Sequence, residues 1–292
     1  MRYFVAVAEE LNFGRAARRL HISQQPLSQQ IKNLEKELGV ELIRRTTRRV
    51  ELTEAGEAFL EETYRTLSQS ELAAEAARRA ARGESGTMRI GYAPTALYNV
   101  LPETLRVFRE RYPGVVLELV ELISAPQEEA LTSGRIDVGF LYPPVEEDGI
   151  ATWVISEEQL MAVLPAGHRL AGRDRVPLAE LSDEPFVMMP RRNRPALYDR
   201  VVGECRRAGF SPRVTQEANN LHMMLGLVAA GFGVNLTVES VRNLKRPGVI
   251  YKPLEAPTEL LAFAVAWRCG EESPVLFNFL EVVREIAVSS AA

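Results

Sequence analysis

Amide and hydroxyl side chains gather near the start of one amphipathic segment, residues 24–38. Its apolar residues recur at three- and four-residue intervals, which predicts a helix with one buried face. The opposite face has few carboxylates, and its polar residues are Gln24, Gln25, Ser28, Gln29, Lys32 and Asn33. Amides pair bidentately with adenine in the DNA major groove, and a serine hydroxyl bonds a base or a phosphate. This pattern predicts that the exposed face contacts DNA.

The residues on either side of this helix predict a helix-turn-helix. Ala16, Ala17 and Leu20 give a preceding helix its apolar stripe, and residues 21–23 form the turn. Ser23 is a preferred N-cap residue, Pro26 fits the first helical turn, and Gly39 is typical of a left-handed C-cap. In such a motif the second helix presents its N-terminal residues to the bases. The loop that follows suits phosphate contacts, since it contains Arg44, Arg45, Thr46, Thr47, Arg48 and Arg49.

Charge is distributed unevenly along the chain. Residues 14–50 hold nine Lys and Arg against three Glu, a local charge of +6, whereas the whole chain has a net charge of −4. A basic region confined to one end of an acidic chain is typical of a nucleic-acid-binding domain. A three-helix bundle with an ordinary solvated face remains the alternative.

Residues 3–58 resemble the winged helix-turn-helix of LysR-type transcriptional regulators. The matching stretch is YFVAVAEELNFGRAARRLHISQQPLSQQIKNLEKELGVELIRR, followed by VELTEAG. Two residues depart from the common pattern, because Gln25 replaces a frequent proline and Gln29 a frequent basic residue. The expected DNA-contacting residues are Ser23, Gln24, Gln25, Pro26, Ser28, Gln29, Lys32, Arg45, Thr47 and Arg48. Within this set, Arg45 and Arg48 are expected to hold phosphates.

Composition is that of an ordinary globular protein and favours no enzyme or membrane class. The 292 residues are 46% hydrophobic and 25% charged, enough for more than one domain, with no signal-like start and no apolar run of membrane length. Cys205 and Cys269 lie far apart and are expected to be free and buried in a reducing compartment. The three histidines lack metal-ligand spacing, so no metal, cofactor or catalytic residue is expected, and the protein should act in the cytoplasm.

Residues 53–82 predict one long helix, which Gly83–Gly86 then end as a hinge. A seam of mostly small residues near a 3.5-residue period suits close approach of a second helix. Its members are Leu60, Thr63, Leu67, Ser70, Ala74, Ala77 and Ala81. The resemblance implies that this helix links the domains and mediates a homodimer or homotetramer. A helix that packs only within its own chain is the alternative.

From residue 88 the pattern alternates strands with helices, which predicts an α/β domain with a mainly parallel sheet. The fold class is therefore α+β and α/β. The expected domains are 1–58, a winged helix-turn-helix; 59–87, a linker and dimerisation helix with its hinge; and 88–292, an effector-binding domain. The resemblance implies a two-lobed sensor like the periplasmic binding proteins, with lobe I at about 88–160 and 267–292 and lobe II at about 161–266.

A ligand of such a sheet lies beyond the carboxyl ends of its strands. Thr95 follows the first strand, and Ser124 follows the second, with Gln127 three residues later as in a capping box. Hydroxyls and helix N-termini favour anions. The resemblance implies that Thr95 and Ser124 contact the effector's polar end, while residues 195–197, including Pro195 and Leu197, face it from the other lobe. His222 is expected at a helix start near the cleft.

Two alternatives limit this ligand-site prediction. Thr95 and Ser124 also suit plain helix capping, which is compatible with ligand contact. Arg191, Arg192 and Arg194 are expected to be solvated surface rather than ligand contacts.

Taken together, the sequence predicts a ligand-responsive regulator that binds double-stranded operator DNA. Two stretches, RIGYAPTALYNVLP and the run from ELISAPQEEAL to GRIDVGF, resemble regulators of aromatic-compound catabolism. The implied effector is a small carboxylate, an aromatic acid or a muconate-like dicarboxylate. A solute-binding or small-molecule-binding protein without operator-specific regulation is the alternative, although it would not need the basic helix-turn-helix.

Overall fold

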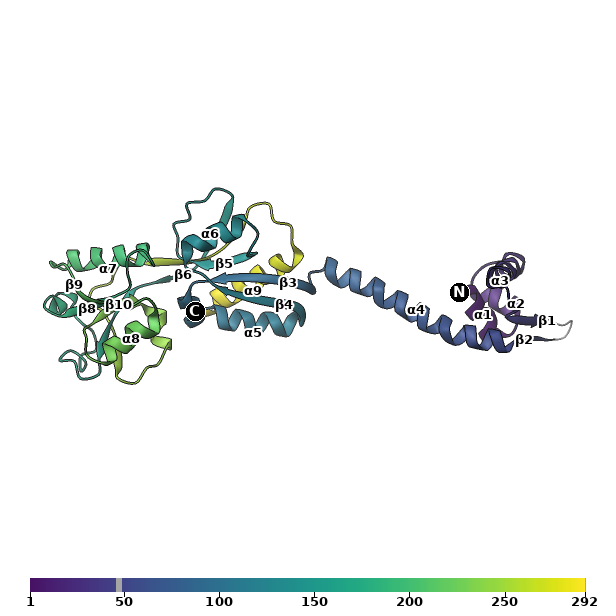
Figure 1. Cartoon of the computed structure of the whole chain (residues 1–292), viewed down its shortest axis with the longest axis horizontal. Coiled ribbons are helices and arrows are strands. Elements are labelled where there is room, and N and C mark those ends of the chain that lie inside the picture. The colour runs from purple at the N-terminus through teal and green to yellow at the C-terminus, as the bar shows by residue number, and fades with distance from the viewer. Residues whose placement is uncertain (46–48, 292) are drawn as a thin grey trace. The chain divides into compact units, whose positions relative to one another are not determined.

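The computed structural model describes residues 1–45 and 49–291, which form two compact units, Met1–Arg79 and Ala80–Ala292 (Figure 1). The elements of the first unit are α1 (Arg2–Glu10), α2 (Phe13–Arg19), α3 (Gln24–Leu38), β1 (Ile43–Arg45), β2 (Val50–Leu52) and most of α4 (Glu54–Ala81).

The first unit is the winged helix-turn-helix that the sequence predicted. α1, α2 and α3 enclose a small core that includes Phe4, Leu27 and Ile31, all at most 1% exposed. β1 and β2 pair antiparallel as the wing, with Ile43 opposite Leu52. The apolar residues of α3 repeat at helical spacing, so Leu27 and Ile31 enter this core, Leu34 packs at its edge and the amides are left outside. Leu38, at the end of the helix, is 43% exposed and does not follow the rest of this face.

The second unit has two lobes. The elements of lobe I are β3 (Ser85–Tyr92), η1 (Pro94–Tyr98), α5 (Leu101–Arg111), β4 (Gly114–Glu121), α6 (Ser124–Thr132), β5 (Val138–Leu141), β6 (Ile150–Glu158), β12 (Leu261–Arg268) and α9 (Pro274–Ala291). The elements of lobe II are β7 (Leu160–Pro165), η2 (Leu178–Leu181), β8 (Pro185–Met188), α7 (Pro195–Arg207), β9 (Arg213–Glu217), α8 (Leu221–Ala229), β10 (Asn235–Val238), η3 (Glu239–Asn243) and β11 (Val249–Pro253).

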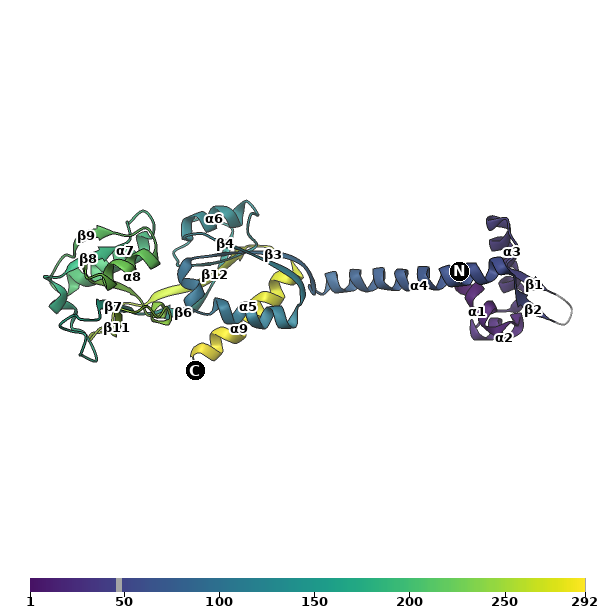
Figure 2. The ribbon, with the colours of Figure 1, turned by 60° about the horizontal axis from the view of Figure 1, so that its bottom comes forward.

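Lobe I is a five-stranded sheet in the order β4-β3-β5-β12-β6. β3 runs parallel to β4 and β5, and β12 runs antiparallel to β5 and β6. α6 covers one face of this sheet, and α5 and α9 cover the other (Figure 2). The carboxyl ends of β3, β4 and β5 therefore meet at one edge, where the ligand loops were expected.

The prediction of a mainly parallel sheet is wrong for lobe II. Its three-stranded sheet, β10-β7-β11, is antiparallel throughout, and only the β8–β9 pair is parallel. The central strand β7 follows β6 after a single residue, Gln159, so the chain enters lobe II as a strand and not as a strand–helix unit. The strand pattern alone did not reveal this change of direction.

The chain returns to lobe I earlier than expected. β12 begins at Leu261, which pairs with Glu158 of β6, so lobe I resumes there and not at residue 267. β6 itself was not predicted, because polar residues interrupt its apolar pattern. The two segments between the lobes are thus the β6–β7 step and residues 254–260.

Gly83 ends α4 by a conformation that only glycine adopts without strain. Its φ is +68°, and a Cβ there would lie 2.6 Å from the backbone of Pro274. The side-chain amide of Asn278 also donates to the carbonyl of Arg82 at 2.9 Å. The predicted hinge is therefore short, since β3 already begins at Ser85.

Candidate functional site

The outer face of α3 is polar, and it is exposed in the first turn of the helix. Ser23 occupies the N-cap position, but its exposed side chain makes no capping hydrogen bond, contrary to expectation. Gln24, Gln25 and Pro26 are exposed in the first turn, and Gln29 and Lys32 follow on the next turns. The Gln29 amide donates to Asn33 Oδ1 at 2.9 Å and otherwise projects from the surface.

Arg45 lies against the protein instead of projecting from the wing as a phosphate contact would. Its guanidinium donates to Ser28 Oγ at 2.7 Å and sits 4.3 Å from the ring centre of Phe13. Its Nη2 is 3.8 Å from Glu35 Oε2, and only 28% of the side chain is exposed. Glu35 in turn accepts hydrogen bonds from the N–H groups of residues 42 and 43 at 3.0 Å. Arg45 is thus placed to fix the wing against α2 and α3.

The tip of the wing lies partly outside the described residues. Thr47 and Arg48, both predicted to contact DNA, fall in that gap, so their contacts stay predictions. Arg44 and Arg49 flank it and are both exposed, and Arg49 pairs with Glu51 at 2.8 Å.

Only part of the predicted seam on α4 is available to a second chain. Thr63 is 1% exposed, and Leu60 packs on the core of the first unit, so both serve their own domain. The ring of Phe59 meets Phe4 edge-on, with 5.1 Å between the ring centres. This contact packs the N-terminal end of α4 against the core of the first unit. Leu67 is half-buried, and the later seam residues, Ser70, Ala74, Ala77 and Ala81, are exposed.

A cavity of about 600 Å³ lies between the two lobes of the second unit, and it holds three of the predicted effector residues: Ser124, Pro195 and Leu197. Its complete lining is Ala93, Ile123, Ser124, Ala125, Glu128, Glu129, Tyr142, Pro144, Glu146, Glu147, Arg191, Arg192, Asn193, Arg194, Pro195, Ala196, Leu197 and Asp199. This volume is in the range of small-molecule sites.

Thr95 lies beneath this cavity, 1% exposed, and joins the lobes. Its Oγ1 accepts from the phenol of Tyr142 at 2.9 Å and from Arg194 at 3.0 Å. The Arg194 guanidinium also lies 5.2 Å from the ring centre of Tyr142. Burial, and then the negative charge of Glu158, raise the pKa of Tyr142, so its phenol is a neutral donor. Arg194 was expected to be solvated surface, but it reaches from lobe II into lobe I.

Ser124 contacts the same tyrosine from the other side. Its Oγ accepts the backbone N–H of Tyr142 at 3.2 Å. The capping box expected here does not form, because Ile123 holds the N-cap position and the buried Gln127 amide donates to the carbonyls of Leu122 and Phe140. The Gln127 side chain packs directly against Gly139. A Cβ at residue 139 would lie 2.7 Å from Gln127 Oε1, so only glycine leaves room for it.

Two helix N-termini open on the cavity, and both favour an anion. α6 begins at Ser124 and α7 begins at Pro195, and the first two residues of each helix line the cavity. Thr95, in contrast, lies within the short 3₁₀ turn η1, and α5 starts only at Leu101. The expected helix dipole at Thr95 is therefore replaced by the charge of Arg194.

His222 does not join this site. It is exposed on the first turn of α8 and is absent from the cavity lining, and Asn220, two residues earlier, caps the helix by accepting from Met223 N at 2.8 Å. Tyr142 is the residue that sequence reasoning missed. It directly follows β5, at the same sheet edge as the two predicted loops, and that position was the available signal.

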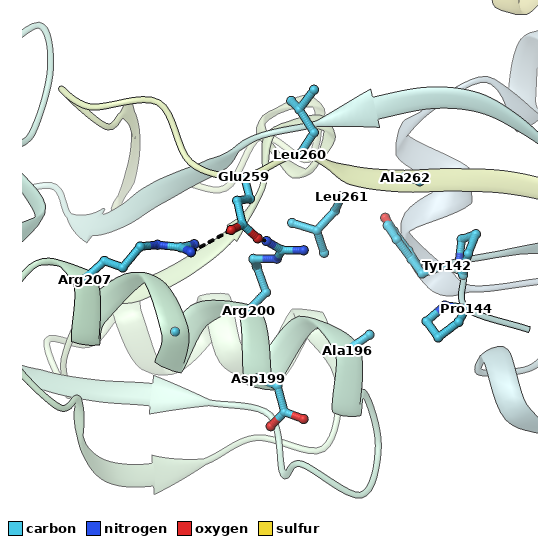
Figure 3. Close-up of a pocket in the computed structure, with 12 residues that line it drawn as sticks. Tyr142, Pro144, Ala196, Asp199, Arg200, Arg207, Glu259, Leu260, Leu261 and Ala262 are labelled. Atoms are coloured by element: carbon cyan, nitrogen blue, oxygen red, sulfur yellow. Dashed lines mark hydrogen bonds and ion pairs between the residues drawn. The ribbon is translucent and has the colours of Figure 1, made fainter.

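A second cavity of about 560 Å³ lies between α7 and the segment that enters β12 (Figure 3). Arg200 and Arg207 extend from α7 toward Glu259, and Arg207 Nη1 is 2.7 Å from Glu259 Oε1. Tyr142 borders both cavities. These ion pairs connect α7, whose first residues line the first cavity, to a segment that crosses between the lobes.

Residues 1–45 and 49–291 contain no group of three His, Cys, Asp or Glu side chains placed to hold a metal, and no helix long and apolar enough to cross a membrane. Cys205 is buried and free, and burial raises the pKa of its thiol to about 12. Cys269 is also free but exposed, so the expectation that both are buried is wrong for it.

Comparison with known proteins agrees with both units. Residues 1–57 match the bacterial regulatory helix-turn-helix of the lysR family, and residues 81–287 match the LysR substrate binding domain. The chain is 39% identical over 282 residues to the transcriptional regulator AlsR of Bacillus subtilis (strain 168), covering 97% of this chain and 93% of that protein.

Two solved structures extend this comparison. Full-length CbnR complexed with its target DNA has a TM-score of 0.86 and 31% identity, covering 98% of both chains. The BenM effector binding domain with its effector benzoate has a TM-score of 0.64 and 30% identity, covering 70% of this chain and 93% of that one.

Proposed function

The chain belongs to the LysR family of DNA-binding transcriptional regulators, and we propose that it changes its action on an operator when a small organic anion enters the cavity between its lobes. Its relatives are regulators and not enzymes. Because its target is DNA, we propose that it works in the cytoplasm on double-stranded operators.

For the DNA contacts, we propose that the exposed amides of α3 meet base edges in the major groove. The set is Ser23, Gln24, Gln25, Pro26, Ser28, Gln29 and Lys32. Support comes from the exposure of all but the half-buried Ser28, whose hydroxyl keeps a hydrogen to donate while its oxygen accepts from Arg45. Phosphate contacts are assigned to the wing tip, including Thr47 and Arg48, and to exposed Arg44 rather than Arg45.

The ligand part of the proposal rests on one observation, the guanidinium of Arg194 held against Thr95 at the base of a cavity that two helix N-termini also face. A carboxylate there would receive hydrogen bonds from a cation, from backbone N–H groups and from a serine hydroxyl. The ring of Tyr142 and the side chain of Leu197 supply apolar contacts. An aromatic acid fits this combination, and the benzoate complex of a relative agrees with it. A muconate-like dicarboxylate can also place one carboxylate at Arg194, but its second carboxylate would meet a cavity wall that carries Glu128, Glu146 and Glu147.

Regulation would follow from lobe closure. Arg194 belongs to lobe II and Thr95 to lobe I, so a ligand between them contacts both. It shifts the equilibrium only if it binds one arrangement of the lobes more tightly than the other. We further propose that the chain acts as a homodimer or homotetramer, with α4 beyond Leu67 as the dimer contact.

A thermal-shift screen of small carboxylates with the full-length chain tests the ligand proposal. Benzoate and muconate are the first probes, and binding should raise the melting temperature. The Thr95→Val and Arg194→Gln variants should lose this response but retain operator binding without ligand. Arg191→Gln is the matched control, because Arg191 lines the same cavity but already pairs with Asp199 at 2.7 Å. An unchanged dose–response in both test variants would locate the site elsewhere.

A further inference from the structure

We infer that the effector has two polar ends, a carboxylate at Arg194 and an ammonium or other hydrogen-bond donor at Glu128. This inference rests on the proposed function and specifies the ligand class of the same cavity. It follows from the unequal distribution of charge along the cavity wall.

The Arg194 end is positive. In the described part of the chain no carboxylate pairs with Arg194, whose guanidinium contacts the hydroxyl of Thr95 at 3.0 Å and the side chain of Tyr142. Arg191, by comparison, is neutralised by Asp199. A ligand carboxylate that reaches Arg194 therefore meets an uncompensated cation.

Tyr142 sets the spacing between the two ends. Its phenol contacts Thr95, the partner of Arg194, and its backbone N–H contacts Ser124. Thr95 and Ser124 are thus separated by the whole length of a tyrosine. Glu128 lies four residues into α6, the helix that begins at Ser124. Arg194, through Thr95, is thus placed at the phenol end of Tyr142, whereas the helix that carries Glu128 begins at its backbone end.

The Glu128 end is negative. Glu128 is only 6% exposed, and its Oε2 accepts from the N–H groups of Glu146 and Glu147 at 2.8 and 3.2 Å. Its Oε1 has no hydrogen-bond partner among the described residues, and the side chain lines the cavity. The carboxylates of Glu146 and Glu147 lie on the same wall, and no Lys or Arg in the described ranges pairs with any of the three.

This arrangement separates ligand classes that share a carboxylate. A carboxylate oxygen that receives no hydrogen bond from the protein is stabilised when a ligand supplies a donor, and most of all a cationic one. A second carboxylate at the same place meets three negative side chains and is repelled. Compounds with a carboxylate at one end and an amine at the other should bind best, simple acids next and dicarboxylates worst.

Matched probes of one chain length test this order by isothermal titration of the full-length protein. They are 6-aminohexanoate, hexanoate and adipate, with 4-(aminomethyl)benzoate, 4-methylbenzoate and terephthalate as the rigid set. In at least one set the amino acid should bind about tenfold or more tightly than the simple acid, the gain expected for one charge-assisted hydrogen bond. 2-Aminohexanoate, with its amine beside the carboxylate, should lack this gain.

Two variants assign the effect to its residue. Glu128→Gln keeps an oxygen for the two backbone N–H groups but removes the charge, so the preference for the amino acid should fall to near parity. Glu103→Gln is the control in the same lobe, since Glu103 is exposed, pairs with Arg106 at 2.6 Å and does not line the cavity, and it should keep the preference. Melting temperatures of both variants without ligand report folding.

The outcomes are distinct. If in both sets the simple acid or the dicarboxylate binds the unmodified protein as tightly as the amino acid, the two-ended ligand is wrong, while the anion site of the proposed function stands. The inference also fails if Glu128→Gln folds and keeps the full preference. If no compound in either set binds, both the inference and the anion site are rejected.

Discussion

Replacing Arg45 with methionine should loosen the contact between the wing and α3 without changing the number of phosphates that the protein neutralises. Three contacts are lost. The hydrogen bond from the charged guanidinium to Ser28 is worth about 1.5–3 kcal/mol. The cation–π contact with Phe13 adds about 0.5–1 kcal/mol at a partly exposed site. The 3.8 Å approach to Glu35 adds little, because the side chain is 28% exposed.

Methionine retains much of the packing of the arginine stem, so a net loss of about 2–3 kcal/mol is expected for local stability. Hydrogen exchange of the full-length chain measures this directly in peptides from α3 and β1, where protection should fall by that amount. Operator affinity should fall for every sequence, since the wing and α3 are positioned less well. The slope of log affinity against log salt should not change, because no phosphate contact is removed.

Arg44→Met is the matched control. Arg44 precedes Arg45 on β1 and, because successive strand residues point to opposite faces, its side chain is exposed. This variant should leave exchange unchanged and lower the salt slope by about 0.9, the value for one phosphate. The opposite result, a reduced slope for Arg45→Met with normal protection, would show that Arg45 binds phosphate and that its position in the structure is not the one used on DNA.

Three further predictions concern other parts of the chain. Gln29→Ala should change base preference at a few operator positions, measured by selection from a randomised operator library, and equal weakening on all DNA would reject base contact. Glu at both Leu67 and Ala74, which are seven residues apart on the predicted seam, should yield monomers with low operator affinity in sedimentation, whereas an intact dimer would exclude this face of α4. A thiol reagent at neutral pH should label exposed Cys269 at once and Cys205 only on unfolding, because burial raises the pKa of the Cys205 thiol to about 12. The contribution of the buried, neutral Cys205 thiol to folding stability is complete below the ordinary thiol pKa and is lost as pH rises toward 12.

The parts of the fold that the sequence predicted are those set by local rules. The buried face of α3 followed from helical spacing, and the left-handed C-cap at Gly39, with φ of +71°, followed from glycine's freedom. The α/β character of residues 88–292 followed from alternating strands and helices, whereas the division into two lobes was implied by the family resemblance. None of these depends on which distant residue becomes a neighbour.

The features that sequence reasoning missed depend on such distant contacts. Nothing near Arg45 in sequence indicates that Phe13 and Ser28 will surround its guanidinium. Arg194 sits among other arginines and was assigned to the surface for that reason, yet its partner, Thr95, is 99 residues away. Ser124 and Gln127 have the spacing of a capping box, but burial of Gln127 between strands took its amide elsewhere.

Tyr142 explains how an anion at one place can affect the junction of the lobes. Its phenol donates to Thr95, and it also lies 3.5 Å from Glu158 Oε1, at the end of β6 where the chain leaves lobe I. The other oxygen of Glu158 accepts the N–H of Ser240 in lobe II at 2.8 Å. Since its raised pKa keeps the phenol neutral, it has one proton for two acceptors. A ligand that draws Arg194 away from Thr95 changes how strongly Thr95, relative to Glu158, accepts the Tyr142 proton. The same change then reaches the Glu158–Ser240 hydrogen bond, which spans the junction of the lobes. Binding energy in the cavity is then available to favour one arrangement of the lobes over another, which is the condition for a ligand to act as a switch.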